Sequence, residues 1–179
     1  MNMESRTGRD NQRKMKPAPD ISSFDALQTA DLTLRQGFGG QGERLVAGVV
    51  PMSADKSQVL IIQSTRRGGW VLPKGGWELD EPTASAAAYR EAWEEAGVIC
   101  SIEADLGEIL DNRPSSKQTA SAPKCQYRFF EGIVKEEKSE WPEMAKRNRQ
   151  WVGYAQAVQA LNDRPELLEA LRRSSLRKD

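Results

Sequence analysis

Three carboxylates fall on one face of a short predicted helix, and no other feature constrains the chain as strongly. Glu91, Glu94 and Glu95 stand at positions i, i+3 and i+4 of the run Arg90-Glu91-Ala92-Trp93-Glu94-Glu95, which places their side chains on one helical face. Like charges at this spacing destabilise a helix by about 0.2–0.5 kcal/mol per pair. Oxygen-rich surfaces suit Mg²⁺ or Mn²⁺, which proteins often share with substrate phosphates. The cluster therefore predicts a divalent-metal site; the simpler interpretation is a solvated helix face.

A pair of adjacent glycines precedes this helix. The run Pro73-Lys74-Gly75-Gly76-Trp77 follows a short apolar segment, Trp70-Val71-Leu72, which predicts a strand. Adjacent glycines let the backbone approach a phosphate group or a metal closely, because no Cβ intervenes. The order strand, glycine loop and acidic helix therefore predicts a site that holds a phosphate chain together with its metal ions.

The two ends of the acidic helix also have sequence signals. Pro82 suits the first turn of a helix, and Asp80 or Glu81 is the expected cap before it. Gly97 is the expected stop, since glycine adopts the left-handed conformation that is common after a helix. The apolar residues 98–100 then predict another strand.

The absence of histidine limits the chemistry that this chain can perform. Among 179 residues there is no histidine, and 26 basic residues balance 26 acidic ones. A histidine base, a Ser-His-Asp triad and histidine metal ligands are therefore excluded. Hydrolysis would depend on carboxylates, metal ions and lysine, which agrees with the glutamate cluster. The zero net charge provides no global field to attract nucleic acid.

Composition predicts one soluble intracellular domain. The length of 179 residues and a hydrophobic content of 38% suit a single domain with its own core. No segment resembles a membrane span or a signal peptide. Cys100 and Cys125 do not make a disulfide framework, so we expect reduced thiols. We therefore expect a monomeric, cytoplasmic protein, present also in the nucleus, without membrane association.

The remaining segments predict a polar arm followed by a mixed domain. Residues 1–40 lack sustained periodicity and predict a disordered arm before a domain at residues 41–179. The basic run Arg13-Lys14-Met15-Lys16 suits contact with a nucleic acid or an import receptor, and a solvated tail is the simpler interpretation. The expected strands are residues 44–51, 58–63 and 126–134, with a further strand pair within 102–110. The expected helices lie near 155–161 and 165–172, and residues 112–124 predict a mobile loop.

Residues 76–98 resemble the Nudix box, a pattern written G-x5-E-x7-R-E-U-x-E-E-x-G-U with U apolar. The chain matches at Gly76 and through the run from Arg90 to Val98. One position differs, because the family glutamate would fall at Pro82 and Glu81 lies one residue earlier. That glutamate is mainly structural in the family, so the difference leaves the predicted chemistry intact.

The flanks of the box resemble a narrower group. Residues 44–48, 70–76 and 164–171 are similar to the fungal diphosphoinositol polyphosphate phosphohydrolases, which also act on diadenosine polyphosphates. The resemblance implies an α/β fold, namely a Nudix-type α/β/α sandwich with a mixed β-sheet. It extends over residues 40–177, which is nearly the whole predicted domain.

The resemblance also implies roles for individual residues. Glu94 is the expected general base, with Glu91 and Glu95 as the principal ligands of Mg²⁺ or Mn²⁺. The backbone carbonyl of Gly75 is an expected further ligand. Arg90 is expected to pair with a neighbouring glutamate and hold it in position.

Basic residues supply the expected substrate contacts. A diphosphoinositol polyphosphate concentrates many phosphates on one ring, and arginine can grip phosphate through two parallel hydrogen bonds. Ordinary surface charge is the simpler interpretation for each residue. The expected substrate-binding residues are Arg44, Ser64, Arg66, Lys74, Gly76, Arg147 and Arg164, and further basic candidates are Arg67, Lys124, Lys146 and Arg149.

These residues together predict metal-dependent hydrolysis of phosphoanhydride bonds. The expected reactions remove the β-phosphate of diphosphoinositol polyphosphates and cleave diadenosine polyphosphates. The alternative within the family is an enzyme for polyphosphate, capped RNA or other nucleoside diphosphate derivatives. A pocket that binds a base needs an aromatic stacking platform, for which Trp70, Trp77 and Trp93 are available; core packing is the simpler interpretation of these tryptophans. A binding module without catalysis is the alternative from another class, and the intact glutamate cluster argues against it. Apart from capped RNA, we expect no nucleic-acid partner.

Overall fold

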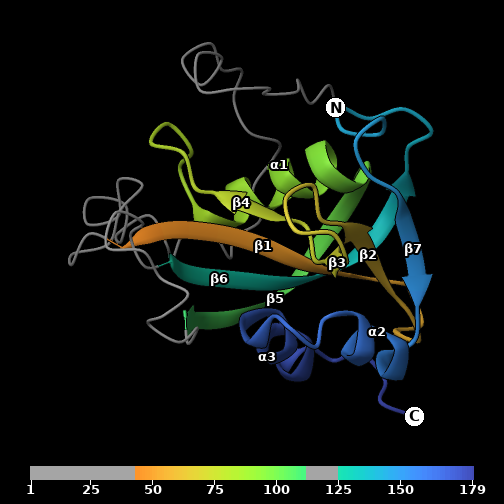
Figure 1. Ribbon diagram of the computed structural model, residues 1–179. Helices are drawn as coiled ribbons and strands as arrows, with labels where there is room; N and C mark the ends of the chain where they lie inside the picture. The colour runs from red at the N-terminus through yellow and green to blue at the C-terminus, as the bar shows by residue number, and fades with distance from the viewer. Residues whose placement is uncertain (1–42, 112–124) are drawn as a thin grey trace.

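The computed structural model describes residues 43–111 and 125–179, which form one mixed sheet with helices on both faces (Figure 1). The predicted arm, the predicted loop at 112–124 and Lys124 lie outside the described residues. The strands are β1 Arg44–Met52, β2 Val59–Gln63, β3 Trp70–Val71, β4 Lys74–Gly76, β5 Val98–Leu110, β6 Cys125–Glu137 and β7 Arg149–Val152. The helices are α1 Ala84–Ala96, α2 Tyr154–Ala160 and α3 Pro165–Arg173.

The sheet confirms the predicted architecture. Its strands run in the order β3-β2-β1-β6-β5, with β4 paired to β1 and β7 paired to β2. The central pair β1 and β6 is parallel, while the other pairs are antiparallel. Helix α1 lies on one face, and α2 and α3 lie on the other (Figure 1). The molecule is therefore an α/β/α sandwich with a mixed sheet.

Both faces of the sheet are buried, which the sequence of β6 illustrates. Phe129 and Phe130 are adjacent and fully buried, because successive side chains of a strand point to opposite faces. Phe130 packs in a cluster with Ala84, Ala87 and Ala88 of α1. The small alanine side chains allow α1 to lie close to the sheet. Phe129 belongs to the larger core, which also contains Leu167, Ala170 and Leu171 of α3.

Helix α1 begins later than the sequence predicted. Its cap is Thr83, whose Oγ1 accepts a hydrogen bond from the backbone N–H of Ala86 at 3.1 Å. The expectation of Asp80 or Glu81 as the cap is wrong, because the Glu81 carboxylate turns to Arg90 instead. The predicted stop at Gly97 is confirmed by its left-handed φ of 66°.

Two other segments differ from expectation. The predicted glycine loop is the short strand β4, in which Gly75 pairs with Ala47 and Lys74 with Gly48 of β1. The segments expected as separate strands after Gly97 form the single strand β5. Register shifts within β5 allow it to follow β6 along its length.

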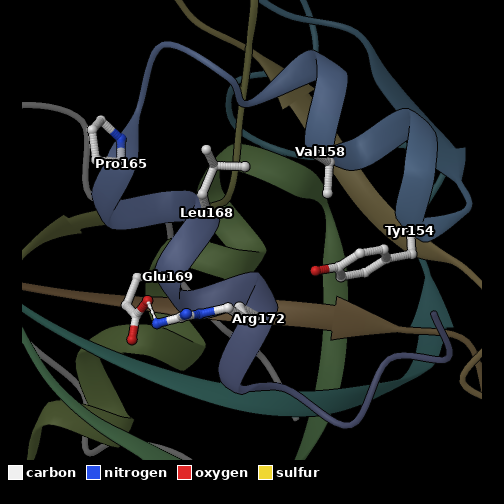
Figure 2. Close-up of a pocket in the computed structure, with 6 residues that line it drawn as sticks. All are labelled: Tyr154, Val158, Pro165, Leu168, Glu169 and Arg172. Carbon is white, nitrogen blue, oxygen red and sulfur yellow. Dashed lines mark hydrogen bonds and ion pairs between the residues drawn. The ribbon is translucent and has the colours of Figure 1, made fainter.

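A shallow pocket of about 380 Å³ lies between α2 and α3, on the face of the sheet opposite α1. Figure 2 shows Tyr154 and Val158 of α2 on one side and Leu168 of α3 on the other. Pro165, Glu169 and Arg172 complete its lining. The pocket contains none of the α1 glutamates and is therefore separate from the predicted metal site.

Candidate active site

The three glutamates of the predicted cluster share a buried face of α1. The side chains of Glu91, Glu94 and Glu95 are only 10%, 8% and 15% exposed. A solvated helix face is therefore excluded. Concentrating carboxylates where little water reaches them requires compensating positive charge.

Arg90 supplies that charge at the centre of the cluster. Its guanidinium contacts Glu91 at 2.7 Å and Glu94 at 3.0 Å. It donates to both carboxylate oxygens of Glu81 at 3.1 Å and to the backbone carbonyl of Gly76 at 2.9 Å. Arg90 therefore ties the glutamates of α1 to the β4 segment.

Glu81, which stands one residue before the box position at Pro82, still reaches Arg90. Its carboxylate is buried and accepts from the backbone N–H of Glu78 at 3.0 Å, in addition to Arg90. Trp77 is also buried, and its indole N–H donates to the Glu81 carbonyl at 3.1 Å. A glutamate one residue early thus reaches Arg90 because residues 78–81 form a tight turn before the helix.

Glu91 lies directly against the backbone of β4. A Cβ added at Gly75 would lie 2.1 Å from the Glu91 Oε1 atom, so only glycine permits this approach. Burial raises the pKa of Glu91 to about 8, and the neighbouring Arg90 guanidinium opposes that shift. The Glu91 carboxylate therefore lies directly against the strand that contains Gly75.

Glu95 is held by donors on each of its oxygens. The backbone N–H of Lys74 donates to Oε2 at 3.0 Å, and the Arg147 guanidinium donates to Oε1 at 3.4 Å. Burial raises the pKa of Glu95 to about 7, and the charges of Arg147 and Lys74 oppose the shift. The carboxylate is therefore fixed in orientation between β4 and the segment before β7.

The donor set of this site fits a hard divalent cation. Glu91 and Glu95 offer carboxylate oxygens, and Gly75 offers a backbone carbonyl on the strand that touches Glu91. Within residues 43–111 and 125–179, no group of three or more His, Cys, Asp or Glu side chains is arranged for a metal. Mg²⁺ does not require one, since it commonly uses one or two carboxylates together with water and substrate phosphates.

The segment 138–149 closes the C-terminal end of α1. The last carbonyls of a helix have no partner within it, and here a distant segment supplies the donors. The pairs are Glu143 N–H with the Glu94 carbonyl at 3.1 Å, Trp141 Nε1 with the Glu95 carbonyl at 3.2 Å, and the Arg149 guanidinium with the Ala96 carbonyl at 2.9 Å. The sequence predicts only basic substrate contacts in this segment and gives no signal of its role at α1.

Part of the predicted basic set gathers around β4. The Arg44 guanidinium lies beside Gly76, where an added Cβ would be 3.1 Å from its Nη2 atom. Burial lowers the pKa of Lys74, and the positive charge of Arg164 lowers it further. Arg164 donates to Glu166 at 2.6 Å. Arg44, Lys74 and Arg164 are therefore near neighbours of the predicted metal site.

The other predicted substrate residues occupy different surroundings. Ser64 and Arg66 lie in the turn between β2 and β3, where the Ser64 hydroxyl accepts from the backbone N–H of Arg66 at 3.4 Å. Arg66 is exposed. Arg147 is only 7% exposed and lies among protein groups. Its assignment to substrate binding stays a prediction, as do the other residue assignments.

Comparison with known proteins identifies the family. A profile of the NUDIX domain matches residues 42–173. Nudix hydrolase 16, mitochondrial, of Arabidopsis thaliana is 38% identical over 148 residues, which cover 73% of this chain and 81% of that protein. The chain belongs to the Nudix family of hydrolases. The finer resemblance to the fungal enzymes stays a prediction.

Solved structures agree with the fold. A NUDIX hydrolase from Nitrosomonas europaea superposes with a TM-score of 0.61 at 17% identity, covering 73% of this chain and 87% of that one. The C. elegans Ap4A hydrolase superposes with a TM-score of 0.53 at 20% identity, covering 72% and 93%. At these identities the likeness shows a shared fold.

The expectation that this protein is located in the cytoplasm and nucleus is wrong, because it disagrees with the names of similar proteins. Relatives with 33–38% identity have names that end in mitochondrial or chloroplastic, Nudix hydrolases 16, 18 and 21 of Arabidopsis thaliana among them. Composition could not reveal this, because targeting depends on short segments and not on the domain. Among the described residues, no helix is long and apolar enough to cross a membrane.

Proposed function

We propose that this chain hydrolyses phosphoanhydride bonds with the help of Mg²⁺ or Mn²⁺. The preferred reaction removes the β-phosphate of diphosphoinositol polyphosphates, and diadenosine polyphosphates are further substrates. The observation that carries the proposal is the buried face of α1, where Glu91 and Glu94 pair with Arg90, Glu91 lies against Gly75, and Glu95 accepts a hydrogen bond from the backbone N–H of Lys74. A purely structural role would leave such a concentration of buried carboxylates without a reason.

The chemistry follows from the positions of these side chains. Glu91, Glu95 and the Gly75 carbonyl would hold the cation, which neutralises phosphate charge and acidifies a bound water. Glu94 takes the proton of the attacking water, while Arg90 at 3.0 Å keeps its carboxylate in place. The water oxygen forms a bond to phosphorus, the bridging P–O bond breaks, and the leaving phosphate departs with the bridging oxygen. For an inositol substrate the products are inorganic phosphate and the ring with one phosphate fewer.

The basic residues near β4 support a substrate with dense phosphates. Arg44 and Lys74 lie on paired strands, and Arg164 is close enough to lower the pKa of Lys74. Glu166 and Glu95 offset part of the repulsion between these two cations, and the phosphates of a dense substrate would add further compensation. Ser64, Arg66 and Gly76 complete the proposed contacts.

A substrate panel tests the proposal. Phosphate release is measured with Mg²⁺ or Mn²⁺ for diphosphoinositol pentakisphosphate, diadenosine hexaphosphate, capped RNA, polyphosphate and ADP-ribose, with Glu94→Gln as the blank. We expect the first two to have the highest kcat/KM. Highest kcat/KM for ADP-ribose or capped RNA would contradict the substrate class, and no release from any substrate would indicate a binding module.

A further inference from the structure

We propose that Arg147 is a positioning residue that orients the Glu95 carboxylate, instead of a residue that grips substrate phosphate. The inference rests on the proposed function for the role of Glu95 as a metal ligand. It rests on the geometry for everything else, since both terminal nitrogens of Arg147 contact groups of the protein, while its buried Nε has no hydrogen-bond partner.

The two terminal nitrogens of the Arg147 guanidinium contact three groups of the protein. One terminal nitrogen donates to the backbone carbonyl of Gln63 at 3.1 Å. The other lies 3.4 Å from Glu95 Oε1 and 2.8 Å from Glu143 Oε2. The side chain is only 6% exposed. A phosphate could engage this guanidinium only by breaking contacts that join three separate parts of the chain.

Glu143 anchors the arginine from the other side. Its carboxylate pairs with Arg147, and its backbone N–H donates to the carbonyl of Glu94 in α1. Arg147 is also tied to the end of β2 through Gln63. The guanidinium therefore has a fixed position relative to the helix that carries Glu95.

These contacts define where the Glu95 carboxylate points. Arg147 holds one oxygen and the Lys74 backbone N–H holds the other. A carboxylate oxygen has two acceptor sites, so each oxygen retains one for a cation. Groups that hydrogen-bond a metal ligand typically contribute 10–100-fold in metal affinity. The positive charge of Arg147 acts in the opposite direction by repelling a cation, and we expect orientation to outweigh that repulsion.

The test measures Mn²⁺ binding by calorimetry without substrate. For Arg147→Gln we expect a dissociation constant raised by about 10–100-fold, with KM at saturating metal within about twofold of the parent. The matched control is Arg172→Gln, the same substitution on α3 at a side chain that is 69% exposed, and it should leave the Mn²⁺ constant unchanged. Glu143→Gln, which keeps the arginine and removes its anchor, should weaken Mn²⁺ binding in the same direction by a smaller factor.

Other outcomes would overturn the inference in distinguishable ways. Unchanged Mn²⁺ affinity with a raised KM would make Arg147 a substrate residue. Unchanged affinity and KM with a lower melting temperature would make it purely structural, and tighter Mn²⁺ binding would make it only a competing cation. If Arg147→Gln does not fold, the Glu143→Gln measurement decides, with an unchanged constant overturning the inference. Absence of Mn²⁺ binding by the parent protein would instead refute the proposed function itself.

Discussion

Helices α1 and α3 carry the same kind of charge pair in different surroundings. Arg90 and Glu94 of α1 stand four residues apart with side chains 10% and 8% exposed. Glu169 and Arg173 of α3 have the same spacing with side chains 26% and 37% exposed. The pKa of Glu169 is lowered by its hydrogen bond to Arg173, while burial raises that of Glu91 although Arg90 is 2.7 Å away.

The difference shows that spacing alone does not distinguish a functional carboxylate from a surface one. On α3 water solvates both partners, and the pair contributes little to stability. On α1 the same spacing is buried beneath β4, so the carboxylates depend on Arg90 for compensation.

The largest expected effect is on catalysis. Glu94→Gln should lower kcat by about 10²–10⁴-fold, because it removes the proposed general base and keeps the side-chain volume. Glu169→Gln on α3 should leave kcat unchanged. Initial rates at saturating substrate and Mg²⁺ check both variants, and a Glu94→Gln enzyme with half the parent kcat would refute the role of Glu94.

Replacing Arg90, the positive charge at the centre of the glutamate cluster, should mainly lower the free energy of unfolding. Arg90→Met leaves buried carboxylates without their partner, and breaking a buried ion pair from one side costs about 3–5 kcal/mol. Arg172→Met on α3 removes an exposed partner of Glu169 and should change the free energy of unfolding by about 0–1 kcal/mol. Urea titrations in the absence of metal measure both, and equal losses would contradict the comparison.

Lys74→Ala should raise KM for diphosphoinositol pentakisphosphate. The expected loss is about 1.5–3 kcal/mol, the range for a hydrogen bond to a charged group. ADP-ribose, with two phosphates, should be a poor substrate for the parent enzyme. The check is kcat/KM for both substrates in parent and variant. Efficient ADP-ribose hydrolysis without any effect of Lys74→Ala on the inositol substrate would leave the substrate class open.

The raised pKa of Glu91 predicts how stability depends on pH without metal. The pKa rises from 4.5 to about 8 on folding, so between these values the folded protein binds more protons than the unfolded chain. Stability should therefore be greatest near the lower value and fall as pH rises towards 8. Melting temperatures in a chelating buffer from pH 5 to 8 measure the decline. Glu91→Gln should reduce it, and a rise with pH would contradict the assigned shift.

The smallest expected effect concerns the start of α1. Thr83→Ala removes the cap hydrogen bond to Ala86 and should destabilise the protein by about 0.5–2 kcal/mol. Asp80→Ala, at the cap position expected from the sequence, should have a smaller effect. Urea unfolding of the two variants distinguishes them, and the reverse order would restore the earlier assignment of the cap.

The sequence predicted those elements whose signals are local. Gly97 as the helix stop and the strand at β6 depend on neighbouring residues, and both are present. The start of α1 was wrong because Glu81 takes part in a long-range ion pair with Arg90, which no cap rule includes. β4 was expected as a loop because its pairing with β1 is not visible in three residues that contain two glycines.

The candidate site was accessible to sequence reasoning only in part. The box located Glu91, Glu94 and Glu95 together with Arg90. The environment of Arg147 was hidden, since a basic run looks the same whether its side chains meet water or buried carboxylates. The contacts of Trp141 and Glu143 with α1 were equally hidden, because hydrogen bonds to helix carbonyls leave no periodic pattern in a sequence.

The donors that cap the C-terminal end of α1 are synthesised well after the helix itself, which affects when the helix can reach its final geometry. Trp141 and Arg149 lie 46 and 53 residues beyond their acceptors Glu95 and Ala96. While a ribosome is still adding the residues between, those carbonyls lack their final partners. The acidic face therefore reaches its final geometry only after residue 149 has emerged from the ribosome. A nascent or truncated chain ending before Trp141 would contain the whole Nudix box and still lack the donors that cap the end of α1.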